Sequence, residues 1–173
     1  LIDYNETHGF NILNIGLRHT DPTIRDTDND GLMDYDEVVV YFTDPLFNDT
    51  DNDGLIDGDE VIGFNITGIG FRKTDPTKND TDGDGLSDWN ETMGFEIPGI
   101  GFRYTDPIIL DTDGDGLNDS AEYIGFYIEI VGDIRHTDPT RKDTDGDGVN
   151  DFDEVYIYLI DPTLKDSDGD GLI

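Results

Sequence analysis

Acidic residues recur along this chain in one twelve-residue pattern, D-x-D-x-D-G-[LV]-x-D-x-x-E. The copy at residues 80–91, "DTDGDGLSDWNE", places five carboxylates within twelve residues. Carboxylates this close repel one another, so either some of them keep a proton or a cation neutralises the group. The pattern therefore predicts a cation site in each copy.

The spacing of the acids favours calcium. Oxygen ligands at positions 1, 3, 5, 7, 9 and 12 around a glycine at position 6 form a calcium-binding loop. Alternate side chains of the turned segment point inward, position 7 offers its backbone carbonyl, and the closing glutamate binds through both oxygens. Magnesium demands a stricter octahedron with fewer carboxylates. A solvated acidic run, the plainer interpretation, does not require glycine at position 6 and glutamate at position 12 in every copy.

Complete copies begin at Asp26, Asp49, Asp80, Asp111 and Asp143, with spacings of 23, 31, 31 and 32 residues. The predicted ligands are Asp26, Asp28, Asp30, Leu32, Asp34 and Glu37; Asp49, Asp51, Asp53, Leu55, Asp57 and Glu60; Asp80, Asp82, Asp84, Leu86, Asp88 and Glu91; Asp111, Asp113, Asp115, Leu117, Asp119 and Glu122; Asp143, Asp145, Asp147, Val149, Asp151 and Glu154. Truncated copies add Asp3 and Glu6 at one end and Asp166, Asp168, Asp170 and Leu172 at the other. We expect about five or six calcium ions in all.

The spacings define two lengths of repeat. We expect the end of a truncated repeat with a hairpin at 1–25, short repeats at 26–48 and 143–165, long repeats at 49–79, 80–110 and 111–142, and the start of a truncated repeat at 166–173. Because the chain begins and ends inside the pattern, we interpret it as a segment of a longer repetitive protein whose neighbouring repeats are its first partners.

Local signals predict the elements between the loops. An Asp-Pro dipeptide, preceded by threonine in five of six cases with Ile160 as the exception, predicts a turn before each loop. In the long repeats a glycine after the glutamate ends a short helix, and alternation around Gly68 or Gly99 predicts a small hairpin. The short repeats have no such glycine, and their "EVVVYFTDP" and "EVYIYLIDP" fit either one and a half to two helical turns or a short strand.

These elements predict a calcium-stabilised tandem-repeat rod, mostly irregular loops with short helices and small β-hairpins and no large core. Each repeat has too few apolar residues for a core of its own, so repeats must pack against one another. The expected contacts join the position-7 leucines to Phe10, Phe64, Phe95 and Phe126. Recurrent arginines (Arg18, Arg72, Arg103 and Arg135) are expected either to pair with a loop carboxylate or the Asp-Pro aspartate, or to stay solvated.

The combined pattern, T-D-P-x-x-x-D-T-D-x-D-G-L-x-D-x-x-E, resembles the microbial form of the thrombospondin type 3 repeat. It departs from an EF-hand, because the apolar residue stands at position 7 rather than 8 and a proline precedes each loop. The long repeats also resemble the calcium-binding segment of binary bacterial toxin translocation subunits, without implying toxicity. The resemblance implies calcium held by the three leading acids, the position-7 carbonyl and the closing glutamate, and a second ion sharing some of those acids.

Charge and composition exclude several classes of function. The chain of 173 residues has 42 acidic and 10 basic side chains, a formal net charge of -32 and no cysteine. Nucleic acid and anionic membranes would be repelled, and no apolar run is long enough to insert into a bilayer. With 34% hydrophobic residues, the chain must have its acids neutralised before it can compact. Nothing in the sequence supports catalysis, so we expect no enzyme.

Six Asn-x-Ser/Thr sequences favour an exported, N-glycosylated protein: Asn5, Asn48, Asn65, Asn79, Asn90 and Asn118. We therefore expect an extracellular or cell-surface structural segment of a filament, stalk or surface layer, in which further copies could assemble. The alternatives are a calcium-rigidified adhesion module, with Trp89, Tyr123 and Tyr127 as candidate contacts, and a linker in a secreted multidomain protein or toxin.

Overall fold

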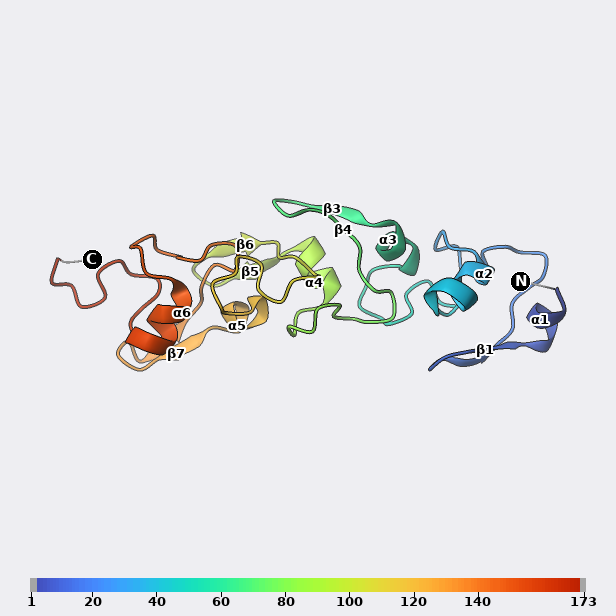
Figure 1. Ribbon diagram of the computed structural model, residues 1–173, viewed down its shortest axis with the longest axis horizontal. Helices are drawn as coiled ribbons and strands as arrows, with labels where there is room; N and C mark the ends of the chain where they lie inside the picture. The colour runs from blue at the N-terminus through green and yellow to red at the C-terminus, as the bar shows by residue number, and fades with distance from the viewer. Residues whose placement is uncertain (1–2, 172–173) are drawn as a thin grey trace. The chain divides into compact units, whose positions relative to one another are not determined.

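The computed structural model describes residues 3–171, in which short helices and two-stranded hairpins alternate with the acidic loops (Figure 1). Contacts within the chain define two compact units. The first contains the repeats up to Thr81, and the second starts at Asp82 and includes the tip of one earlier hairpin, Ile66–Gly70.

A helix begins at position 9 of every complete loop. In the long repeats it is one α-helix ended by glycine: α3 (Asp57–Ile62), α4 (Asp88–Met93) and α5 (Asp119–Ile124), with α1 (Asp3–His8) its equivalent. Gly63 ends α3 with φ 95° and ψ 161°. The φ is positive as expected, but the ψ is extended rather than the left-handed helical value predicted from the sequence. A side chain would be strained in this conformation.

The short repeats are helical, which resolves the alternative that the sequence left open. In each short repeat, three α-helical residues are followed directly by a π-helical turn. The first short repeat has α2 (Asp34–Asp36) and then η1 (Glu37–Tyr41), and the second has α6 (Asp151–Asp153) and then η2 (Glu154–Tyr158). Each turn ends at a non-glycine residue in the left-handed region, Phe42 at φ 63° and Leu159 at φ 58°. The wider π turn lets the chain reach the next Asp-Pro without a hairpin.

Each long repeat continues into an antiparallel hairpin of two three-residue strands. The pairs are β1 (Phe10–Ile12) with β2 (Gly16–Arg18), β3 (Phe64–Ile66) with β4 (Gly70–Arg72), β5 (Phe95–Ile97) with β6 (Gly101–Arg103), and β7 (Phe126–Ile128) with β8 (Asp133–Arg135). Phe95 pairs with Arg103, and Phe126 with Arg135. The last hairpin has a turn one residue longer, which accounts for the spacing of 32 residues between Asp111 and Asp143.

Apolar packing is distributed along the chain in small clusters. One such cluster joins the position-7 Leu86 to Phe95 and Ile97 of the following hairpin, and Ile97 has no exposed surface. The hairpin isoleucines Ile12, Ile66, Ile97 and Ile128 are more deeply buried than the phenylalanines that we expected to lead this packing. Two of these phenylalanines also join successive repeats, as expected, since the ring of Phe95 lies 5.1 Å from that of Tyr123 and the ring of Phe126 lies 5.9 Å from that of Tyr156.

Three of the hairpin arginines pair with an Asp-Pro aspartate beyond the next loop. Arg18 donates to Asp44 at 2.6 Å, Arg103 to Asp138 at 2.7 and 2.6 Å, and Arg135 to Asp161 at 2.7 Å. The three aspartate side chains are at most 6% exposed. Each pair therefore spans a whole acidic loop. Over residues 3–171 the fold is the predicted series of tandem repeats without a large core.

Candidate metal centres

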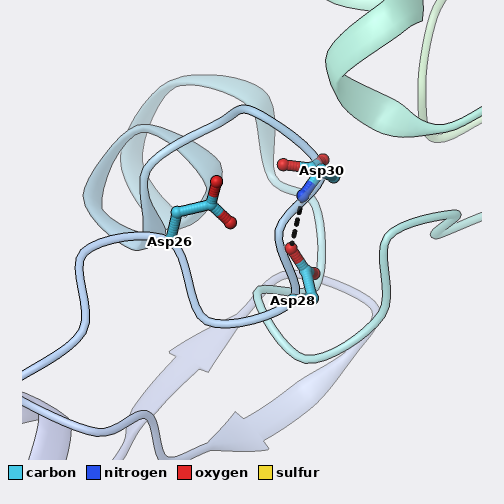
Figure 2. A group of neighbouring side chains, drawn as sticks. All are labelled: Asp26, Asp28 and Asp30. Carbon is cyan, nitrogen blue, oxygen red and sulfur yellow. Dashed lines mark hydrogen bonds between the residues drawn. The ribbon is translucent and has the colours of Figure 1, made fainter.

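In four of the complete loops the three leading acids converge on one point. Figure 2 shows Asp26, Asp28 and Asp30 directed toward a common space in the turn of the first complete loop. One carboxylate oxygen from each lies within 4.8 Å of the others. The same arrangement occurs at Asp49, Asp51 and Asp53, at Asp80, Asp82 and Asp84, and at Asp111, Asp113 and Asp115.

Backbone amides of the same loop position these acids. Asp111 accepts hydrogen bonds from Gly114 at position 4 and Gly116 at position 6. Asp113 accepts one from the amide of Asp115, and Asp115 accepts one from Leu117. The glycine at position 6 has a positive φ of 111° in this loop. Each leading acid is thus oriented by the turn that its neighbours form, so the site is largely formed by local sequence.

The aspartate at position 9 is fully buried in all five complete loops, and in four of them it is hydrogen-bonded to the start of its own loop. Asp57 accepts hydrogen bonds from the amide and the hydroxyl of Thr50, at 2.8 and 2.7 Å. The same clamp joins Asp34 to Thr27, Asp119 to Thr112 and Asp151 to Thr144. An oxygen of Asp57 also lies within 4.8 Å of oxygens of Asp30 and Glu37 in the preceding loop. Position 9 therefore closes its loop and faces the loop before it.

The closing glutamates are buried and have carboxylate oxygens without a hydrogen-bond partner. Glu37, Glu60, Glu91, Glu122 and Glu154 have no exposed surface. Their Oε2 atoms are buried without a hydrogen-bond partner, as are the Oδ2 atoms of Asp28, Asp51, Asp113 and Asp145 at position 3. A buried carboxylate oxygen with no donor is costly. Glutamate and aspartate of one loop share this condition, so their orphaned oxygens fit a hard divalent cation.

The proton affinities of these acids support the same conclusion. Burial, reinforced by the neighbouring loop aspartates, raises the pKa of Glu37 to about 9 and that of Glu122 to about 10. Burial also raises the pKa of Asp51 and Asp113 to about 7. Without a metal these groups hold protons near neutral pH, and a bound cation would displace them.

The remaining predictions concern position 11, the two truncated loops and the candidate contact aromatics. Asp59, at position 11 and outside the predicted ligand set, is exposed. Asp166 forms the same turn as the complete loops, bonded to the amides of Gly169 and Gly171. Leu172 and the side chain of Asp3 lie outside the described residues. Of the candidate contact aromatics, Tyr123 packs on Phe95, whereas Tyr127 is 69% exposed.

The threonines around the loops hydrogen-bond to predicted ligands, and sequence reasoning did not assign them. Position 2 is threonine in every complete loop and serine in the truncated copy at Asp166, a regularity that could have revealed the clamp on position 9. The threonine before Asp-Pro bonds the closing glutamate, as Thr105 does to Glu91 at 3.0 Å.

Two lysines were also missed. Lys142 and Lys165 each donate to the position-4 carbonyl of the preceding loop, Gly114 and Gly146.

The structure sorts the six candidate glycosylation sites. Asn65 and Thr67 are both exposed beside the β3–β4 turn, and Asn5 and Thr7 are exposed on α1. Asn118 instead caps α5 through its side chain, and the hydroxyl of Ser120 is buried. Thr92, the threonine of the Asn90 glycosylation sequence, is buried. Thr50, the threonine of the Asn48 sequence, donates its hydroxyl to Asp57. Asn79 is exposed.

Comparison with known families agrees with this geometry. Five segments match the bacterial TSP3 repeat, at residues 26–46, 49–63, 80–91, 111–123 and 143–157, and each contains one complete loop. These five matches confirm the resemblance to thrombospondin type 3 repeats. The repeats indicate a calcium-binding repeat region. Neither curated proteins nor solved structures gave a match.

Proposed function

We propose that this chain is an extracellular structural segment that folds into a stiff series of repeats by binding calcium, one ion or more in each complete loop. The observation that carries the proposal is the closing glutamate, fully buried with an orphaned oxygen in all five complete loops. A protein with no cation to bind would lose stability at each of these positions. The role is mechanical and involves no catalytic step.

Calcium concentration favours a place outside the cell. Loop sites of this kind in extracellular modules have dissociation constants of about 0.1 to 1 mM, which external calcium saturates and cytosolic calcium does not. The exposed Asn65 and Asn5 are compatible with glycan attachment in an exported protein. Every helix within residues 3–171 is too short or too polar to cross a membrane. A filament, stalk or surface layer would use such a segment as a spacer.

Removal of calcium tests the proposal. Each ion that binds only the folded chain contributes about 2.7 kcal/mol at a hundredfold excess over its Kd. Five such sites give roughly 13 kcal/mol, comparable to the whole stability of an ordinary domain. Excess EGTA should therefore abolish the circular dichroism of the folded chain and enlarge its hydrodynamic radius, and calcium should restore both.

Sodium chloride at matched ionic strength is the control, because screening lowers the repulsion without supplying a ligand geometry. Titration calorimetry should find about five sites. A chain that stays compact in EGTA, or that binds one calcium ion or none, would contradict the proposal. Mass spectrometry of the protein from its native source would test the glycans, which we expect on Asn65 and Asn5 and not on Asn118.

A further inference from the structure

The closing glutamates differ in one contact. In four complete loops the threonine before Asp-Pro donates its hydroxyl to Oε1 of the glutamate: Thr43 to Glu37 at 3.3 Å, Thr74 to Glu60 at 2.9 Å, Thr105 to Glu91 at 3.0 Å and Thr137 to Glu122 at 2.9 Å. These threonines are at most 8% exposed. The hydroxyl thus lies in a dry site, where its hydrogen bond to a carboxylate is strong.

The fifth complete loop lacks this donor. Ile160 takes the place of the threonine after the loop 143–154, and both carboxylate oxygens of Glu154 are buried without a hydrogen-bond partner. In Glu37, Glu60, Glu91 and Glu122, only Oε2 is buried without a hydrogen-bond partner.

The two short repeats show that the change is confined to the side chain. Thr43 and Ile160 both follow a π-helical turn, and both donate their backbone amides to the carbonyl of the closing glutamate, at 3.2 Å in the first repeat and 3.0 Å in the second. Residues 43 and 160 therefore occupy equivalent backbone positions beside the closing glutamate. One site has a hydroxyl there and the other has a methyl-bearing side chain that cannot donate.

We propose that the threonine before Asp-Pro is a positioning residue for calcium binding, and that the loop at 143–154, which lacks it, is the weakest of the five complete calcium sites. The proposal rests on the calcium-binding function proposed above. A donor on Oε1 fixes the rotation of the carboxyl group and turns Oε2 toward the loop acids, so that the glutamate is ready to bind through both oxygens. Glu154 must be ordered by the ion itself, which lowers the affinity.

The strength of the effect follows from comparable sites. Residues that orient a metal ligand without touching the metal typically change the affinity about 10- to 100-fold. Lys165 donates to the Gly146 carbonyl of this loop as Lys142 does to Gly114 in the loop at 111–122, so the lysine does not distinguish the two loops and the missing hydroxyl does. As external calcium falls, the 143–154 loop should lose its ion first, so the chain would loosen at this repeat before the others.

A reciprocal exchange in the full chain tests the proposal, with Ile160→Thr and Thr43→Ile made separately. Calcium titration is followed by NMR at the position-6 amides, Gly148 for the loop at 143–154 and Gly31 for the loop at 26–37. Ile160→Thr should lower the calcium concentration at half-saturation of Gly148 about 10-fold and leave Gly31 unchanged. Thr43→Ile should raise that of Gly31 about 10-fold and leave Gly148 unchanged.

Two further variants separate positioning from packing. Thr43→Ser keeps the hydroxyl and should retain the affinity of the 26–37 loop, whereas Thr43→Val keeps the shape and should lose it. The exposed Thr77, bonded to Asp75 in another Asp-Pro turn, provides the control Thr77→Val, which should leave every loop unchanged. If Thr43→Ile prevents folding, Ile160→Thr still decides, because it adds a donor to a folded site.

An Ile160→Thr variant whose Gly148 titrates as in the parent chain would overturn the positioning role while leaving calcium binding intact. Failure of all the position-6 glycines to respond to calcium would instead overturn the proposed function and this inference together.

Discussion

The backbone amide of Ser120 donates a hydrogen bond of 2.8 Å to the carboxylate of Asp84, which lies 36 residues earlier in the chain. The Ser120 hydroxyl also donates to the Asp84 carbonyl. Asp84 is the position-5 acid of one loop, and Ser120 stands at position 10 of the next loop, inside α5. A predicted metal ligand is therefore oriented by the following repeat, so calcium binding in one loop and docking of the next helix should strengthen each other.

The first prediction concerns the same junction after a short repeat, where position 10 is Gly58. A Cβ on Gly58 would lie 2.0 Å from the carbonyl oxygen of Asp30. Gly58→Ala should therefore destabilise the calcium-loaded chain by about 1 to 3 kcal/mol in thermal unfolding, although alanine is the better helix former. Ser120→Ala is the matched control: it already has room for a Cβ and should lose only about 1 kcal/mol with its hydroxyl. Equal stability of Gly58→Ala and the parent chain would show that the junction is looser than described.

The second prediction compares adjacent acids at positions 11 and 12. Glu60 has no exposed surface and an orphaned Oε2, whereas Asp59 is exposed. Glu60→Gln should weaken calcium binding of the loop at 49–60 by more than about 10-fold, because a ligand is changed directly. Asp59→Asn, which removes the same charge from the surface, should have little effect. Calorimetric titration of the two variants checks this, and similar losses in both would mean that net charge rather than ligand geometry sets the affinity.

Much of the loop could be predicted because its geometry is local. Glycine at position 6, the leading acids and the closing glutamate stand at fixed spacings, and each acid is oriented by amides a few residues away. The hairpin around Gly99 also follows from alternation and a turn residue within nine positions. Patterns of this length can be recognised in the sequence because the residues that determine each loop or hairpin lie only a few positions apart.

What connects the repeats could not be predicted in the same way. Arg18 was expected to pair with a loop carboxylate or an Asp-Pro aspartate, or to stay solvated. Its pairing with Asp44 depends on how two repeats stack across the loop between them. The contact of Ser120 with Asp84 likewise depends on a separation of 36 residues. The π-helical turn of the short repeats is another case, since five residues cannot show a period that separates it from a strand.

The third prediction tests the ion pairs that span the loops. Burial alone would raise the pKa of Asp138, but hydrogen bonds from Arg103 and Thr140 outweigh it and keep that pKa below its usual value. Arg103→Met leaves a buried carboxylate without its cation and should lower the free energy of unfolding of the calcium-loaded chain by about 3 kcal/mol. Arg141→Met, at an exposed arginine in the same region, should be nearly neutral. Chemical denaturation measures both, and a neutral Arg103→Met would show that the pair is dispensable once calcium is bound.

The fourth prediction is that protons partly replace calcium. Burial raises the pKa of Glu60 to about 9 and that of Glu91 to about 10, far above the value of about 4.3 for an unfolded glutamate. A raised pKa means that the folded chain binds the proton more tightly, so protonation stabilises the metal-free fold. The stabilisation by bound protons is fully present below the pKa of glutamate in the unfolded chain. It disappears as the pH rises through the higher pKa of the glutamates in the folded chain. Metal-free protein should therefore be more folded at pH 5 than at pH 9.

Circular dichroism of protein stripped of metal, recorded across this range, measures the effect, and the calcium-loaded chain should show a much weaker dependence because the ion occupies the same oxygens. Calcium binding at neutral pH should also release protons, since the closing glutamates must ionise to become ligands. Calorimetry in two buffers of different ionisation enthalpy counts them. A metal-free chain that gains structure as the pH rises, or calcium binding without proton release, would mean that the glutamates are already charged in the folded chain and that another group neutralises them.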